Sequence, residues 1–123
     1  MIQRLAALML GLSALSLNLA FAHSGGLARH GGVVATASDL SFELVAEGGN
    51  AVIYVEDHGK PMAPGGMKGK LSVLHGTQKA EAELVAGAAK LEAKGLALAK
   101  GAKAVAVLVT PAAKTITVRF TVK

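Results

Sequence analysis

The chain has 123 residues, of which 13 are Lys or Arg and 8 are Asp or Glu, so its formal charge is +5. It contains no cysteine, which excludes disulfides and every thiolate site. Its basic residues are spread along the chain and only 3% of residues are aromatic, whereas nucleic-acid binders combine a concentrated basic face with stacking rings or a recognisable motif. We therefore expect no nucleic-acid partner.

The N-terminus has the three-part pattern of a secretory signal peptide. Arg4 precedes the apolar run LAALMLGLSALSLNLAFA, which ends in the small-x-small triplet Ala20-Phe21-Ala22. Polar residues interrupt the run and no charge flanks its end, so a permanent membrane anchor is the weaker interpretation. We predict that residues 1–22 are removed on export and that no stable membrane anchor remains.

Residues 23–32, HSGGLARHGG, contain four glycines and two histidines. Because so glycine-rich a backbone is costly to order, we expect this segment to be flexible unless something holds it. If cleavage follows Ala22, His23 carries a free α-amine beside its imidazole, and the two together can chelate one metal ion. Copper(II) is the divalent ion that nitrogen sites bind most tightly, and His30, His58 or Asp57 could complete the site. A solvated tail is the alternative.

Period-two alternation dominates the rest of the chain and predicts β-strands. Residues 40–46 and 115–122 alternate as half-buried strands do. Residues 51–55 and 105–109 are nearly continuous apolar runs, typical of strands buried on both faces or at a sheet centre. Turn residues separate these runs. We predict an all-β fold over residues 33–123, a single antiparallel β-sandwich of immunoglobulin-like or Greek-key type.

Residues 79–100 are ambiguous between strand and helix. Their content of Ala, Leu, Glu and Lys favours a helix by propensity. Gly87 and Gly95 interrupt the segment at the spacing of one strand, and charged or branched residues alternate with Ala and Leu before Gly87. We expect two short strands, with a helix as the alternative.

The stretch DHGKPMAPGGM, residues 57–67, concentrates potential metal ligands in a loop made of turn residues. Met62 and Met67 carry thioethers, soft ligands suited to copper(I) or silver(I), and the surrounding Pro and Gly residues leave little regular structure to bury them. Ordinary packing under the loop is the alternative. Asp57 and His58 end a strong strand, so they bind one ion together only if the strand breaks there. His58 as a plain turn residue is the alternative.

Catalysis has less support in the sequence. No nucleophile elbow, phosphate loop or HExxH helix is present, so we expect no enzyme. The remaining histidine, His75, stands before Gly76 and is expected to be a partly buried residue that closes a strand.

Four stretches together resemble a pattern of small exported proteins of Gram-negative bacteria, HGG…D…ElV…vyvxDHGxP. They are HGGVV at 30–34, Asp39, FELV at 42–45 and VIYVEDHGKPM at 52–62, and the resemblance spans most of residues 30–75. A related pattern is found in the N-terminal region of some heavy-metal efflux adaptor subunits. The resemblance implies a periplasmic β-sandwich that handles copper, silver, zinc, cobalt or nickel. The residues of this chain to which it assigns a part in that function are His30, Asp57 and His58, which stand in the matching motifs.

A second similarity is to small periplasmic copper carriers of the CopC type, whose mature chain starts with a His that binds copper(II). This chain shares that predicted terminus, His23, and the absence of cysteine. It departs from the small copper(I) chaperones that cap the ion with an indole, because it has no Trp.

Taken together, the sequence predicts a periplasmic protein that carries or buffers a transition metal, possible partners including a heavy-metal efflux complex. Copper(I) or copper(II) is the expected ion, with silver or zinc as alternatives. The predicted ligands are His23, His30, Asp57, His58, Met62 and Met67. The alternative is an interaction module that binds no metal and docks on an efflux component or another envelope partner, with Met62 and Met67 as adaptable contacts.

Overall fold

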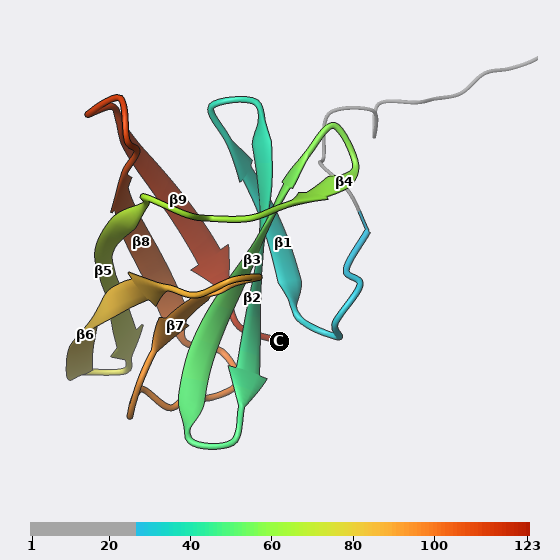
Figure 1. Ribbon diagram of the computed structural model, residues 1–123. Helices are drawn as coiled ribbons and strands as arrows, with labels where there is room; N and C mark the ends of the chain where they lie inside the picture. The colour runs from blue at the N-terminus through green and yellow to red at the C-terminus, as the bar shows by residue number, and fades with distance from the viewer. Residues whose placement is uncertain (1–26) are drawn as a thin grey trace, which may run out of the picture.

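The computed structural model describes residues 27–123, which form nine β-strands (Figure 1). In chain order they are β1 (Val33–Ala37), β2 (Leu40–Glu47), β3 (Asn50–Asp57), β4 (Lys60–Met62), β5 (Lys68–His75), β6 (Gln78–Ala86), β7 (Leu91–Ala93), β8 (Lys103–Val109) and β9 (Thr115–Thr121). The predicted signal peptide and His23 lie outside the described residues.

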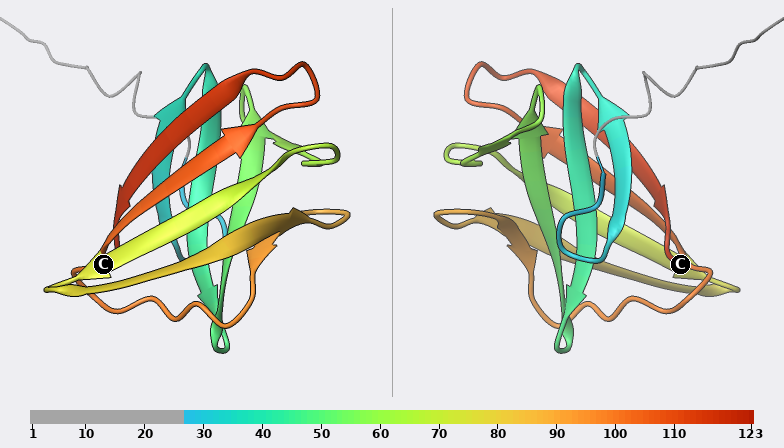
Figure 2. Two further views of the ribbon diagram at one scale, coloured as in Figure 1. Left: turned by 90° about the vertical axis from the view of Figure 1, so that its left-hand side faces the viewer. Right: turned by 90° about the vertical axis from the view of Figure 1, so that its right-hand side faces the viewer.

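All strand pairs are antiparallel and belong to one continuous sheet. The order is β1-β2-β3-β7-β6-β5-β8-β9, and β4 pairs with β3 outside this path. The sheet coils until its two end strands, β1 and β9, contact each other without a hydrogen-bonded ladder, so it is nearly a closed barrel (Figure 2). The short strand β7 bridges β3 and β6.

Alternation of side chains along the strands fills the interior of this barrel. In β9, Ile116, Val118 and Phe120 are buried while the Thr and Arg residues between them are exposed. The other strands contribute residues such as Phe42 and Ile53 to the same core. The connection between β7 and β8, residues 94–102, runs across the lower end of the barrel in Figure 2 and buries Leu96 there.

The predicted all-β class is confirmed, and the described residues include no helix. Residues 79–100 contribute the strands β6 and β7, as expected from the alternation of this segment rather than from its helix propensity, and residues 94–100 belong to the connection after β7. In place of two separate sheets, the structure has one coiled sheet whose opposite sides face each other across the core. No helix in residues 27–123 is long and apolar enough to cross a membrane.

Candidate functional site

A carboxylate on the outer side of β2 holds the segment that precedes β1. Glu43 is buried, although the alternation of β2 places its side chain away from the core. Its oxygens accept hydrogen bonds from the backbone N–H groups of Arg29, His30 and Gly32 at 3.0, 2.8 and 2.8 Å. The His30 ring adds a fourth contact, with Nδ1 2.9 Å from Oε1. We call Glu43 and residues 29–32 the arm latch.

The two glycines of the HGG motif serve the arm latch in different ways. Gly31 has φ +76°, a left-handed conformation that strains any residue with a Cβ. Gly32 lies so close to β2 that a Cβ would overlap the carbonyl oxygen of Leu44 and lie 2.8 Å from Cγ2 of Val45. For residues 29–32 the condition set by the sequence is met, because a carboxylate distant in sequence holds the segment by satisfying its backbone donors.

The arm latch continues into a chain of side-chain contacts across β3. The His30 ring stacks on Tyr54, with centroids 3.6 Å apart and planes 3° apart. The Tyr54 hydroxyl donates to Oε2 of Glu47 at 2.8 Å, and Lys90 Nζ donates to Oε1 of Glu47 at 2.7 Å. The ammonium of Lys90 also lies 5.8 Å from the centre of the Tyr54 ring. His30 is thus held by partners on β2 and β3.

Hydrogen bonds lower the pKa values of the two carboxyl groups in this network. Burial raises the pKa of Glu43, but the hydrogen bonds from the His30 ring and from the backbone of Gly32, His30 and Arg29 outweigh burial, so the pKa lies below its ordinary value of 4.5. The hydrogen bond from Lys90, followed by that from Tyr54, lowers the pKa of Glu47. Glu43 and Glu47 are therefore carboxylates near neutral pH.

The second histidine motif, DHGK, is a tight hairpin turn between β3 and β4. Asp57 pairs with Lys60, and the two residues between them, His58 and Gly59, have φ 53° and 82°. Positive φ at both central positions defines a type I′ turn. The His58 side chain is 86% exposed at this tip, and its Nδ1 lies 2.6 Å from Oδ1 of Asp57. The structure thus agrees with His58 being a turn residue.

His30 and His58 share one arrangement despite their different settings. In each, Nδ1 faces a carboxylate, which when ionised can only accept, so Nδ1 carries a hydrogen and, in the neutral ring, Nε2 has the lone pair. Metal-binding histidines are commonly oriented by such a carboxylate on the other ring nitrogen. Within residues 27–123 no group of three or more His, Cys, Asp or Glu side chains is placed to hold an ion.

The two methionines differ from their predicted setting. Met67 is 5% exposed and belongs to the core cluster, so the expectation of an open-loop thioether is wrong for this residue. A turn places it there, because its N–H donates to the Pro64 carbonyl at 2.9 Å and Pro64 is itself buried. Met62 lies on β4 opposite Val55 and packs, half-buried, against the core.

The segment that precedes β1, residues 27–32, which we call the arm, lies beside the DHGK turn. The guanidinium of Arg29 donates to the Gly59 carbonyl at 3.1 Å and forms an ion pair with Glu56 of β3. Leu27, where the described chain begins, lines a small pocket together with Glu56. Leu27 therefore lies beside β3, next to the residue that precedes Asp57 and His58. His75, by contrast, closes β5 as predicted but is exposed.

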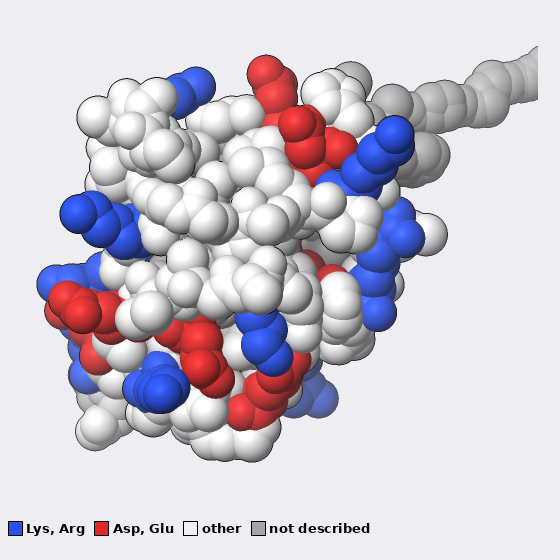
Figure 3. All heavy atoms as spheres, in the orientation of Figure 1, with Lys and Arg blue, Asp and Glu red and all other residues white. Residues whose placement is uncertain are grey.

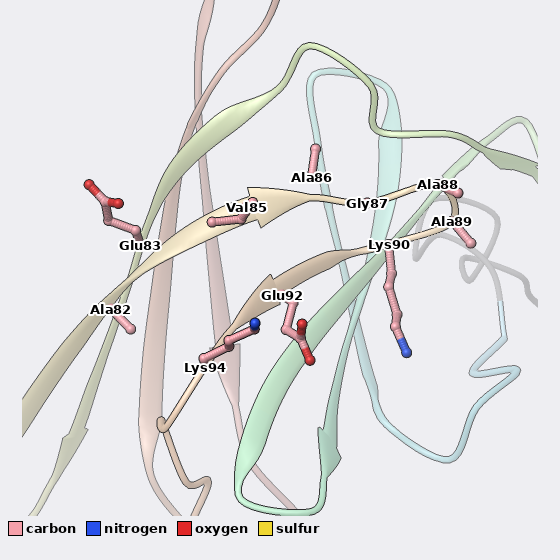
Figure 4. Close-up of a pocket in the computed structure, with 10 residues that line it drawn as sticks. All are labelled: Ala82, Glu83, Val85, Ala86, Gly87, Ala88, Ala89, Lys90, Glu92 and Lys94. Atoms are coloured by element: carbon pink, nitrogen blue, oxygen red, sulfur yellow. The ribbon is translucent and has the colours of Figure 1, made fainter.

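A groove of about 710 Å³ lies elsewhere, between β6 and the β7 hairpin (Figure 4). Two of its four charged side chains do not point to a common centre, because Glu83 points away from β7 while Lys90 extends toward β2 and β3. It contains none of the predicted site residues. A developed small-molecule site has a few polar groups aimed at one point, and this groove has no such set among its lining residues.

Charges of both signs surround a largely uncharged centre on the face shown in Figure 3.

Sequence reasoning missed Glu43 and Tyr54 as members of the candidate site. Glu43 stands in a regular alternation and Tyr54 in an apolar run, so neither departs from the pattern of a strand. Comparisons with protein-family models, with curated proteins and with solved structures found no match.

Proposed function

We propose that this protein is exported to the periplasm, where it binds a transition metal ion, copper first, and carries or buffers it. The observation that carries the proposal is His58. Its ring is fully available at an exposed turn, oriented by Asp57 through Nδ1, and the N-terminal arm is tied down beside it. An exposed site of this kind suits a carrier, because ligands on a surface turn can exchange the ion with another protein.

The remaining ligands would come from the predicted mature N-terminus. His23 would supply an α-amine and an imidazole to one ion, and nitrogen donors favour copper(II) among the divalent ions. Three residues lie between His23 and Leu27, so the four Cα–Cα steps between them span at most about 14 Å when extended. Since Leu27 lies beside Glu56, this reach is compatible with a site that joins His23 to Asp57 and His58.

His30 has a different part in the proposal. Its ring is stacked on Tyr54 and bonded to Glu43, so we assign it to holding the arm rather than to binding the ion. Met67 is left out because it is buried in the core. The proposed donor set is therefore narrower than the one suggested by sequence, and it centres on His23, Asp57 and His58.

Titration of the protein purified after export, its N-terminus verified by mass, tests this set. Copper(II), zinc(II) and silver(I) are added in separate runs against a competing chelator. We expect a one-to-one copper(II) complex that weakens at least about tenfold in His58→Ala and again in His23→Ala, since each change removes an imidazole donor. His75→Ala, at another exposed strand end, serves as the matched control and should bind normally.

Two outcomes would contradict the proposal. One is binding of all three ions no tighter than by a short histidine-containing peptide. The other is equal loss of copper in His75→Ala and His58→Ala, which would indicate scattered capture by exposed imidazoles. His30→Ala separates the roles further, because a positioning residue should lower the affinity less than His58→Ala does and should also loosen the arm.

The alternative of a docking module without metal loses one of its supports. Met67 cannot be an adaptable surface contact while it is packed in the core, and Met62 is half-buried. Of the four exposed large apolar residues in residues 27–123, three lie on other strands, and Leu27 lies beside Glu56.

A further inference from the structure

Basic side chains gather on the outer face of the wall formed by β6, β5, β8 and β9. Figure 2 shows these four strands side by side in the left view. Alternation points every second side chain away from the core, and seven of those outward side chains are charged. Two are acidic, Glu81 and Glu83. Five are basic, namely Lys68, Lys70, Lys79, Lys103 and Arg119. These cations are scattered over residues 68–119 in the sequence, and the register of the sheet brings them together.

One of the two acids, Glu81, is shared by two of the five cations. Its carboxylate lies 3.5 Å from Lys79 Nζ and 3.9 Å from Lys70 Nζ, and it accepts a hydrogen bond from the Ser72 hydroxyl at 3.0 Å. The bond from Ser72, followed by the charges of Lys79 and Lys70, lowers the pKa of Glu81. Glu81 is therefore ionised near neutral pH, and its charge is already used within the chain.

The other three cations have no carboxylate partner in residues 27–123. Lys103 donates to the neutral hydroxyl of Thr121 at 3.0 Å. Lys68 and Arg119 are exposed, and their side chains form no hydrogen bond or ion pair within the described part of the chain. The second acid, Glu83, offsets only one charge. The face therefore keeps an excess of positive charge that pairing within the chain does not neutralise.

Apolar side chains lie between the cations on this face. Three of them, Leu74, Val85 and Val107, are exposed by 46%, 63% and 41%. Each of the five outward valine and leucine residues has a basic residue beside it on a neighbouring strand. The pairs are Lys68 with Val85 and Val109, Lys70 with Val107, Lys79 and Lys103 with Leu74, and Arg119 with Val105. Cationic and apolar groups are thus interleaved over the whole wall.

We propose that this face binds reversibly to the surface of a bilayer that carries anionic phospholipid. Each Lys or Arg close to such a surface strengthens binding by about fivefold, and the apolar side chains between them reach the boundary below the headgroups. Interfacial Trp and Tyr are missing from this face, because the chain has no Trp and its one Tyr lies on β3. The attraction is therefore mainly electrostatic, and salt should weaken it.

The layout of the face favours a planar anionic surface over a linear polyanion. The cations lie on all four strands, so an extended acidic peptide would reach only those along its path, whereas a layer of headgroups meets many of them together. The central strands β5 and β8 are paired on both sides and offer no free backbone edge to an added strand. An acidic peptide would also leave the interleaved valines without a partner, whereas the bilayer provides one.

Co-sedimentation of the exported protein with vesicles measures the binding, with chelator present so that no metal bridges protein and lipid. Vesicles of equal parts phosphatidylcholine and phosphatidylglycerol are compared with vesicles of phosphatidylcholine alone. We expect binding to the anionic vesicles only, strong at low salt and lost at high salt. Lys68→Gln together with Arg119→Gln should weaken it at least about tenfold, because two unpaired cations are removed. The matched control is Lys60→Gln with Lys100→Gln, which removes the same charge from β4 and from the connection beside His30. It should change the affinity less than about threefold.

Three results would overturn the proposal. The first is equal binding to vesicles with and without phosphatidylglycerol. The second is an equal loss in the two double variants, which would assign the attraction to the net charge of the chain rather than to this face. The third is release of the protein from anionic vesicles by polyglutamate at an equal concentration of charge, which would make an acidic polypeptide the preferred partner. Thermal unfolding of each variant checks that the fold is kept. The proposal stands or falls independently of metal binding.

Discussion

The two histidine motifs, HGG at residues 30–32 and DHG at residues 57–59, look alike in the sequence and differ sharply in the fold. His30 is fixed by a hydrogen bond to the buried Glu43 and by a stack on Tyr54. His58 stands 86% exposed, and within residues 27–123 its ring bonds only to its neighbour Asp57. The ring of His30 is tied to two strands, whereas the ring of His58 is tied only to its neighbour.

This difference shows that the residues around a histidine in the sequence do not decide whether it is structural. The partners brought by distant strands decide it. Glu43 converts HGG into a folded latch because it offers two oxygens to four donors. No such distant partner acts on His58 within residues 27–123, so its ring stays available for a ligand. The variants below test this contrast, beginning with the one expected to have the largest effect.

Gly32→Ala should break the arm latch most severely. The new Cβ would overlap the Leu44 carbonyl oxygen, so β2 and the arm must move apart, and we expect a loss of about 3 kcal/mol in the free energy of unfolding. Urea denaturation measures it. Gly49→Ala is the control, because a Cβ there has no neighbour within 4 Å, and its effect should stay within about 1 kcal/mol. Similar losses in both variants would contradict a special role for Gly32.

Glu43→Gln keeps the shape of the side chain but removes half of its acceptor capacity. Buried N–H donors of the arm then lose partners, and the expected loss is about 2 kcal/mol in the free energy of unfolding. Glu56→Gln, on the neighbouring strand and paired with the exposed Arg29, should cost less than about 1 kcal/mol. Faster hydrogen exchange at the amides of His30 and Gly32 in Glu43→Gln alone would locate the damage in the latch; unchanged exchange there would contradict it.

Acidification should weaken the latch more gently. The pKa of Glu43 in the folded protein lies below its ordinary value of 4.5, so between these two values the unfolded chain binds more protons than the folded one. The stability that Glu43 contributes is therefore fully present above about pH 4.5 and is lost as the pH falls through its folded-state pKa. Thermal unfolding from neutral pH downward should show a shallower decline in Glu43→Gln than in the wild type, and equal slopes would refute this assignment.

The strand content of this fold could be predicted from the sequence because it follows from local rules. Alternation in residues 40–46 and 115–122, and glycines at the spacing of one strand in residues 79–100, correctly indicated β2, β9 and the pair β6 and β7. Burial of Met67 was left as the alternative to an open-loop ligand, because it depends on a turn at Pro64 that directs the loop back into the core.

The candidate site was only half predictable for a related reason. Alternation correctly placed Glu43 on the outward face of β2, which by itself suggests a solvated carboxylate. That face is covered by the arm, which lies eleven to fourteen residues earlier in the chain. Nothing in the sequence of β2 itself indicates that this face is covered. The histidines and Asp57 could be picked out in the sequence, whereas Glu43, the carboxylate that orients His30, had to be found in the structure.

The smallest expected effect is also the most informative about His58. A type I′ turn favours Asn at this position because Asn adopts positive φ at little cost, so His58→Asn should raise the free energy of unfolding by about 0.5 kcal/mol. The same change should weaken copper(II) binding, since it removes the imidazole. A gain in stability together with a loss of affinity would mean that His is kept at this turn against the preference of the backbone. A loss of stability would instead make the bond between Asp57 and His58 structural, and the contrast with His30 would narrow to a difference in exposure.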